Sequence, residues 1–122
     1  MKRPSILIIE GNKDVGKLFG DILAYHDFRV DVLSDGQSAV EVIKGKKHYD
    51  LIFISYKVTG TNGVEIIKLI RSTSHRSRTP IIMVTGTAGI KKSALAAGAN
   101  EVLAKPLDMQ GLLAAARRYI PE

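Results

Sequence analysis

The sequence contains no cysteine, so neither disulfide bonds nor thiolate chemistry can contribute to its fold or activity. It also lacks a long apolar run, because the basic amino terminus leads into only the four apolar residues Ile6–Ile9. A run of this length is too short for the core of a signal peptide and far too short to span a membrane. We therefore expect a cytoplasmic protein that does not contact a membrane.

Aromatic residues are scarce, at 6% of the chain, although the formal net charge is +6. The basic residues gather in clusters at positions 44–48, 71–78, 91–92 and 117–118. No aromatic side chains that could stack on bases are interleaved with these charges. Most clusters fall at the carboxyl ends of expected helices, where cations stabilise the helix dipole. A basic adaptor for nucleic acid therefore remains an alternative, and ordinary surface charge is the favoured interpretation.

The pattern along the 122 residues predicts one domain, residues 1–122, with strands and helices in strict alternation. We expect strands at 5–9, 28–33, 51–55, 81–85 and 101–104, and helices at 13–25, 34–46, 64–72, 90–97 and 107–119. Short connections between alternating strands and helices favour a parallel sheet with helices on both faces. The predicted fold class is α/β, a doubly wound five-stranded sheet in the flavodoxin-like order 2-1-3-4-5.

The stretch Asp50–Gly63, DLIFISYKVTGTNG, contains the strand end on which the function most depends. Residues 51–54 are all apolar, as expected for a strand buried on both faces of a parallel sheet. In open α/β sheets ligands bind at the carboxyl ends of the strands, and here that end carries Ser55. The residues that follow have turn chemistry, and Asn62 is placed to cap the next helix.

A phosphate-binding motif is the second pattern to weigh. Gly11–Lys17 follows the first strand and fits G-x-x-x-x-G-K, but the Ser or Thr that should follow to hold magnesium is Leu18. Gly16 and Lys17 fit better inside a helix whose apolar face includes Leu18. A nucleotide-binding protein that uses this loop therefore remains an alternative.

Four blocks in order and spacing resemble the receiver domain of bacterial response regulators, from Ile6 to Ile120. ILIIEGNKDV is similar to its first strand and acidic loop, and DLIFISYKVTGTNG to its phosphoacceptor strand. PIIMVTG is similar to its fourth strand with the switch threonine, and AGANEVLAKPL to its fifth strand with the invariant Lys-Pro. The resemblance implies a role in two-component signalling and the phosphorelay, with Thr85, Lys105 and Pro106 matching the family's pattern. It also implies a cis peptide bond before Pro106.

Other positions depart from the family's pattern. The phosphoacceptor aspartate falls on Ser55, and the paired metal-binding acids fall on Glu10 and Gly11. The proline after the acceptor falls on Thr59, and the aromatic switch position falls on Val102.

These departures predict a site that has lost its chemistry. A serine hydroxyl is a poor nucleophile unless a base activates it, and magnesium prefers several carboxylates with waters. Only Glu10 remains as a carboxylate, and we expect it to pair with Lys105, which should point toward Glu10 and Ser55. We therefore predict an atypical receiver that is not an enzyme and uses no metal or cofactor. Ser55→Asp together with Gly11→Asp should favour metal binding more than Ser55→Asp alone.

The expected partner is another signalling protein or a second copy of the chain. The resemblance implies that the fourth helix, fifth strand and fifth helix form the output face. Val102 has no ring to rotate, so we expect this face to bind in one fixed conformation. Small residues on the two helices could let a partner approach closely; they are Ser93, Ala94, Ala96 and Ala97, then Ala114 and Ala115 beside Arg118.

Overall fold

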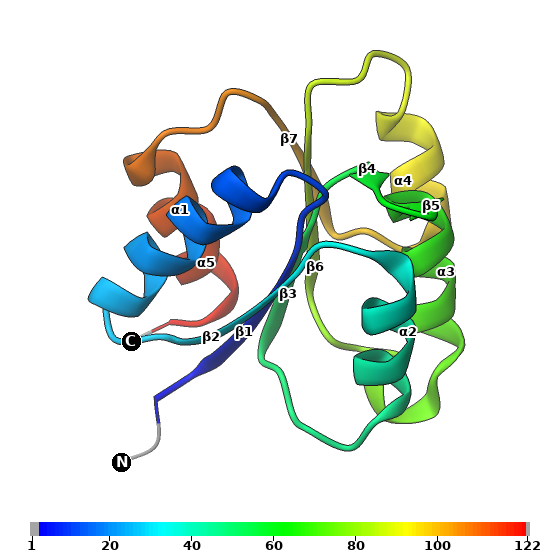
Figure 1. Cartoon of the computed structure of the whole chain (residues 1–122), viewed down its shortest axis with the longest axis horizontal. Coiled ribbons are helices and arrows are strands. Elements are labelled where there is room, and N and C mark those ends of the chain that lie inside the picture. Colours follow the sequence, from blue (N-terminus) through cyan, green and yellow to red (C-terminus); the bar gives the residue numbers. More distant parts are fainter. Residues whose placement is uncertain (1–2, 122) are drawn as a thin grey trace.

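The structure is a computed structural model that describes residues 3–121 (Figure 1). One parallel sheet has the order β2-β1-β3-β6-β7. Its strands are β1 (Ser5–Ile9), β2 (Arg29–Leu33), β3 (Leu51–Ile54), β6 (Ile81–Thr85) and β7 (Glu101–Ala104). The helices are α1 (Lys13–Tyr25), α2 (Gly36–Lys44), α3 (Gly63–Ser72), α4 (Lys91–Ala97) and α5 (Met109–Tyr119). The predicted doubly wound fold, order 2-1-3-4-5 when these five strands are counted in sequence, is confirmed.

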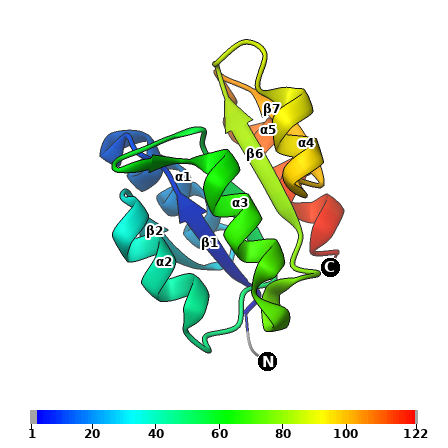
Figure 2. The ribbon, with the colours of Figure 1, turned by 90° about the vertical axis from the view of Figure 1, so that its right-hand side faces the viewer.

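The helices cover both faces of the sheet. Helices α1 and α5 lie on one side, and α2, α3 and α4 lie on the other (Figures 1 and 2). Successive strand residues point to opposite faces, so Phe53 packs with α1 and α5 while Ile52 and Ile54 pack with the other three helices. This double burial explains why the central strands are apolar throughout.

Side-chain caps fix where most of the helices begin. The predicted cap Asn62 is confirmed, because its side chain accepts a hydrogen bond from the backbone N–H of Glu65. Asn12, Asp35 and Asp108 cap α1, α2 and α5 in the same way. Gly98, with φ 123°, ends α4, as the sequence predicted.

Three short elements were not predicted. Strands β4 (Lys57–Val58) and β5 (Thr61–Asn62) form a small antiparallel hairpin after β3, and η1 (Ser74–Arg76) is a single 3-10 turn. Gly60, with φ 86°, provides the left-handed residue that the hairpin turn requires. The hairpin lies at the carboxyl end of β3, beside Ser55.

The apolar face of α1 differs from the sequence prediction. Leu18 is 56% exposed, and the buried side of the helix runs through Gly16, Phe19, Gly20 and Leu23. A Cβ at Gly20 would lie 2.9 Å from a methyl group of Val32. The two glycines therefore let α1 approach β2 closely, and this turns Leu18 toward solvent.

The end of α2 also differs from the prediction, because the helix stops at Lys44 instead of near residue 46. Arg76 is only 2% exposed and donates hydrogen bonds to the carbonyl oxygens of residues 42, 43, 45 and 47. Its guanidinium thus satisfies the last carbonyls of the helix. No helix within residues 3–121 is long and apolar enough to cross a membrane.

Candidate functional site

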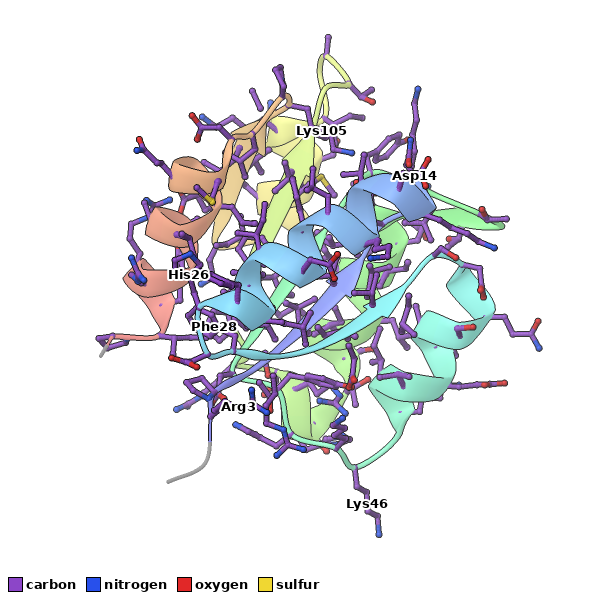
Figure 3. The ribbon with its side chains drawn as sticks, turned by 60° about the vertical axis from the view of Figure 1, so that its left-hand side comes forward. Arg3, Asp14, His26, Phe28, Lys46 and Lys105 are labelled. Carbon is purple, nitrogen blue, oxygen red and sulfur yellow. The ribbon has the colours of Figure 1, made fainter. Side chains whose placement is uncertain are left out.

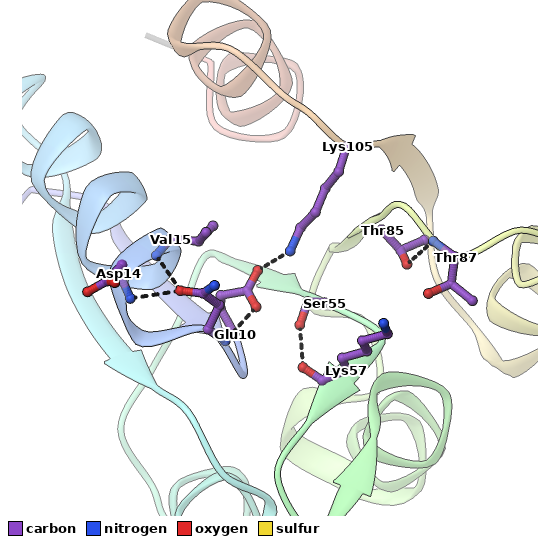
Figure 4. A network of polar contacts seen from close by, with 9 residues as sticks. Glu10, Asp14, Val15, Ser55, Lys57, Thr85, Thr87 and Lys105 are labelled. Carbon is purple, nitrogen blue, oxygen red and sulfur yellow. Dashed lines mark hydrogen bonds and ion pairs between the residues drawn. The ribbon is translucent and has the colours of Figure 1, made fainter.

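An open cleft lies at the carboxyl edge of the sheet, where β1, β3, β6 and β7 end. The side chains that the sequence singled out converge there (Figure 4). The cleft is lined by Glu10, Gly11, Asn12, Ser55, Tyr56, Lys57, Val58, Thr59, Thr61, Asn62, Thr85, Gly86, Thr87 and Lys105. Val102 and Pro106 do not line it.

Glu10 is the carboxylate of the cleft, and both of its oxygens have partners. Its side chain is almost fully buried, and Lys105 Nζ donates a hydrogen bond to its Oε1 at 2.5 Å. The backbone N–H of Asn12 donates to Oε2 at 2.9 Å. The predicted ion pair between Glu10 and Lys105 is confirmed, and it neutralises the charge of the cleft's buried acid.

Ser55 is held by its own loop. The residue is 4% exposed, and its backbone N–H donates to the carbonyl of Ile9. Its hydroxyl donates to the carbonyl oxygen of Lys57 at 2.9 Å. Across residues 3–121, no carboxylate or imidazole accepts a hydrogen bond from this hydroxyl, so no base is placed to activate it.

The carbonyl of Lys57 is the cleft group that sequence reasoning missed. Besides the Ser55 hydroxyl, the backbone N–H of Gly11 donates to it at 3.1 Å. A carbonyl oxygen has two lone pairs, and both have donors here. A Cβ at Gly11 would lie 2.3 Å from this oxygen. The sequence does not reveal this contact, because it joins two backbone groups and the carbonyl of residue 57 does not depend on the side chain there.

Two further glycines hold the rest of the loop. Gly36 donates its N–H to the carbonyl of Thr59 at 2.9 Å, and Gly63 donates to the carbonyl of Tyr56 at 2.8 Å. Cβ atoms at Gly36 and Gly63 would lie 2.6 Å from Thr61 and 2.2 Å from the Ser55 carbonyl oxygen, respectively. The loop after β3 is therefore packed against three glycines from separate elements.

Thr85 makes a local bond at the end of β6. Its hydroxyl accepts a hydrogen bond from the backbone N–H of Thr87, and its carbonyl accepts from the N–H of Lys105. The Lys105–Pro106 peptide bond is cis, as the resemblance implied. Val102 is half-buried and packs against the hydrophobic cluster beneath α3 and α4.

The surface of α4, β7 and α5 is less rich in accessible small residues than the sequence suggested. Ala94 and Ala115 are fully buried and pack in the core, so they cannot touch a partner. Their position follows from the helical period, which turns one residue in three or four toward the sheet. The apolar residues that do face solvent on these helices are Leu95, at 41% exposed, and Ala96 on α4, and Met109, at 51% exposed, and Ala114 on α5.

The geometry does not fit the phosphate-loop alternative. Helix α1 begins at Lys13, so most of the Gly11–Lys17 motif is helical and cannot wrap a phosphate. Lys17 instead pairs with Asp21 one turn away, at 2.8 Å.

Two arginines of the basic cluster at positions 71–78 form hydrogen bonds within the fold. Arg76 caps α2 as described above. Arg71 donates to the carbonyls of residues 76, 77, 79 and 98. These two side chains of the 71–78 cluster therefore stabilise backbone turns instead of forming a surface for nucleic acid.

The donor set of the cleft does not fit magnesium. Such a site needs carboxylates and waters in an octahedral shell. Here the one carboxylate is bonded to Lys105, and the carbonyl of Lys57 already accepts two hydrogen bonds. No group of three or more His, Cys, Asp or Glu residues that could hold a metal ion occurs in the part of the chain that the structure describes.

Comparison with known proteins places the chain in a family. The model of the response regulator receiver domain matches residues 6–117. The chain is 35% identical over 121 residues to the hybrid signal transduction histidine kinase M of Dictyostelium discoideum, covering 94% of this chain and 5% of that protein. It is 33% identical over 118 residues to the response regulator ArlR of Staphylococcus aureus (strain Mu50), covering 94% of this chain and 52% of ArlR. The chain thus spans about half of ArlR and a small part of the kinase.

A solved structure agrees. The receiver domain of the sensor histidine kinase PA1611 from Pseudomonas aeruginosa PAO1, with magnesium coordinated in its active-site cleft, matches with a TM-score of 0.89 and 28% identity. The match covers 98% of this chain and 99% of that one. With the fold, the cleft and these matches in agreement, the chain belongs to the response regulator receiver domain family of two-component signalling.

Proposed function

We propose that this chain is an atypical receiver that accepts no phosphoryl group and acts as a phosphorylation-independent protein-binding module. Receiver phosphorylation moves a phosphoryl group from phosphohistidine to a carboxylate. In this proposal Ser55 takes the position of that carboxylate, and Glu10 and Gly11 take the positions of the paired acids. The switch positions fall on Thr85 and Val102.

The observation that most supports the proposal is the hydrogen bond from the Ser55 hydroxyl to the carbonyl of Lys57. To attack phosphorus, this oxygen would have to transfer its proton to a base. Glu10 is the carboxylate among the residues that line the cleft, but its oxygens are bonded to Lys105 and to the Asn12 N–H. A neutral, hydrogen-bonded hydroxyl without a base is a poor nucleophile.

The proposed output face consists of the exposed residues of α4, β7 and α5, among them Leu95 on α4. An ion pair between Arg118 on α5 and Glu101 on β7 ties two of these elements together, with Arg118 Nη2 2.5 Å from Glu101 Oε2. The hydroxyl of Tyr119 donates to the other oxygen of Glu101 at 3.0 Å. A face braced in this way favours binding in one conformation, with occupancy set by the partner's concentration.

The test is incubation with acetyl phosphate and magnesium, followed by intact-mass measurement. We expect no phosphoryl adduct, whereas a typical receiver treated in parallel gains one. An adduct that hydroxylamine removes would be an acyl phosphate and would overturn the proposal. An adduct that resists hydroxylamine and maps to Ser55 would be a serine ester, and it would overturn the statement that Ser55 is unreactive.

A further inference from the structure

The edge of the sheet opposite the cleft, where the strands begin, is strongly basic. Two adjoining hollows lie along it and share His48, Asp50 and Ile120. Figure 3 shows Arg3 and Lys46 at this end of the molecule, far from Lys105 and Asp14. We call this surface the basic edge, and its lining basic residues are Arg3, Arg29, Lys47, His48, His75 and Arg78.

The carboxylates at the basic edge already have partners. Asp31 accepts hydrogen bonds from Lys47 Nζ at 2.7 Å and from the Tyr49 hydroxyl at 2.6 Å. Asp50 accepts from the backbone N–H of Ser5 at 2.8 Å, and His48 Nε2 lies 2.9 Å from its other oxygen. The local acids are therefore committed to neighbours within the fold.

Three arginines of the basic edge form no ion pair in the described part of the chain, although Arg29 interacts electrostatically with Asp31. Within residues 3–121, no carboxylate forms an ion pair with Arg3, Arg29 or Arg78. All three are exposed to solvent. A guanidinium presents a planar set of donors that matches a carboxylate or a phosphate with two parallel hydrogen bonds. The surface is thus suited to an anionic ligand with several charges.

The floor between these charges indicates which kind of anion fits. Pro4, Pro80 and Ile120 line the two hollows and provide apolar contact. Tyr49 is buried, with the Arg76 guanidinium 5.3 Å from its ring centre, so its face cannot stack on a base. A peptide with separated acids and apolar side chains needs no stacking surface and can use this apolar floor.

We propose that the basic edge binds an acidic protein segment that also carries apolar residues. In this arrangement, carboxylates of the segment bond to Arg3, Arg29 and Arg78, and an apolar side chain covers Ile120. This surface lies at the opposite end of the sheet from the phosphorylation cleft of the family and is separate from the output face proposed above. The domain would then have a second partner surface whose affinity depends on salt.

The test uses a fluorescein-labelled peptide of Asp-Glu pairs alternating with leucine, and a matched peptide with Asn-Gln pairs. Fluorescence anisotropy is measured at ionic strengths of about 0.01 M and about 0.15 M, which shorten the Debye length from about 30 Å to about 8 Å. The acidic peptide should bind more tightly at the lower ionic strength, and the amide peptide should not bind. Failure of the acidic peptide to bind at either ionic strength would overturn the proposal.

The charge-reversal variant R3E/R29E/R78E locates the site. We expect it to weaken binding roughly tenfold or more. The control K13E/K91E/K92E makes the same change in net charge on α1 and α4 and should stay within roughly twofold of the natural chain. Equal loss in both variants would mean attraction to net charge alone and would overturn the proposal. A short DNA duplex is titrated in the same way. If the duplex binds more tightly than the acidic peptide, and R3E/R29E/R78E weakens that binding, the basic edge binds nucleic acid and the proposal is overturned.

Circular dichroism and thermal unfolding confirm that each variant is folded. If the glutamate triple variant does not fold, R3Q/R29Q/R78Q removes the charges without reversing them, and the same comparison applies. The result is independent of whether Ser55 accepts a phosphoryl group, so this proposal and the proposed function can fail separately.

Discussion

A Cβ atom at Gly11 would lie 2.3 Å from the carbonyl oxygen of Lys57. Real Cβ atoms do not approach an oxygen so closely, so a side chain at position 11 and the observed loop exclude each other. The N–H of the same glycine donates to that oxygen at 3.1 Å. The residue that leaves the cleft without a second acid is thus also the residue that lets the backbone of Lys57 approach the end of β1.

The first prediction concerns this close approach. Gly11→Ala should destabilise the fold by roughly 1–3 kcal/mol, because the backbone of Lys57 must move. Gly86→Ala is the matched control in the same cleft, since its new Cβ would meet only Lys105 Cβ, at 3.7 Å. Urea unfolding measures both variants. Equal effects of the two substitutions would show that the loop moves away without cost.

The second prediction revises the expectation that acids at both positions restore a metal site. Asp at 11 places the same Cβ against the loop, so S55D/G11D should be less stable than S55D. We expect it to bind magnesium no more tightly than S55D does. Isothermal titration calorimetry compares the two variants, and a magnesium site found only in the double variant would contradict the steric argument.

The third prediction concerns Arg76, which is buried and bonded to four carbonyl oxygens. Arg76→Met should lower the free energy of unfolding by roughly 2–4 kcal/mol, because those carbonyls lose their donors. Arg78→Met, two residues away and exposed, should change it by at most about 0.5 kcal/mol. Chemical denaturation checks both values, and a mild effect at Arg76 would mean that water replaces the guanidinium.

The fourth prediction concerns alkaline pH. Burial, followed by the hydrogen bond to Asp31, raises the pKa of Tyr49 above its usual value of 10.0. In the unfolded chain this tyrosine ionises near pH 10, while in the folded protein it stays neutral to higher pH. Its contribution to stability is therefore present below about pH 10 and is lost as the pH rises above that value. Tyr49→Phe should make the unfolding free energy fall less between about pH 9 and about pH 11.5.

The exposed Tyr25→Phe is the control for this measurement and should leave the slope unchanged. If the unfolding free energy falls with pH equally steeply in the natural chain and in Tyr49→Phe, Tyr49 is not the source of the decline.

The fifth prediction tests the output face with two exposed leucines. Leu95→Arg on α4 should weaken association with an identified partner or with a second copy by roughly tenfold or more. Leu18→Arg on α1 is similarly exposed and should leave association unchanged. Analytical ultracentrifugation or a binding titration makes the comparison. The reverse pattern would move the interface to α1.

The sequence predicted the parts of the fold that follow from local periodicity and capping. The apolar run Leu51–Ile54 indicated a strand buried on both faces, and Asn62 indicated the start of α3. The pairing of Glu10 with Lys105 could also be predicted, because the resemblance assigned them to the ends of the first and fifth strands, which converge at the same edge of the sheet. These inferences depend on residue type, which the sequence states directly.

The parts that could not be predicted depend on backbone groups and on helix rotation. The carbonyl of Lys57 occupies the cleft whatever side chain that residue carries. Leu18 was expected to be buried and is exposed, because the glycines of α1 face the sheet in its place. Ala94 was expected to be exposed and is buried, because the helical period turns it toward the sheet. Arg76 looked like surface charge until the end of α2 was placed around it.

The most direct test of the central claim is a nuclear magnetic resonance titration of the natural chain with magnesium and then beryllofluoride. The receiver domain of PA1611, whose cleft coordinates magnesium, is the positive control. We predict no saturable shift of the backbone amides of Gly11, Ser55 and Lys105, because the one carboxylate of the cleft is paired with Lys105 and the Ser55 hydroxyl is bonded to its own loop. Saturable shifts at these three amides would show that the cleft takes a metal and a phosphoryl analogue, and would contradict the account.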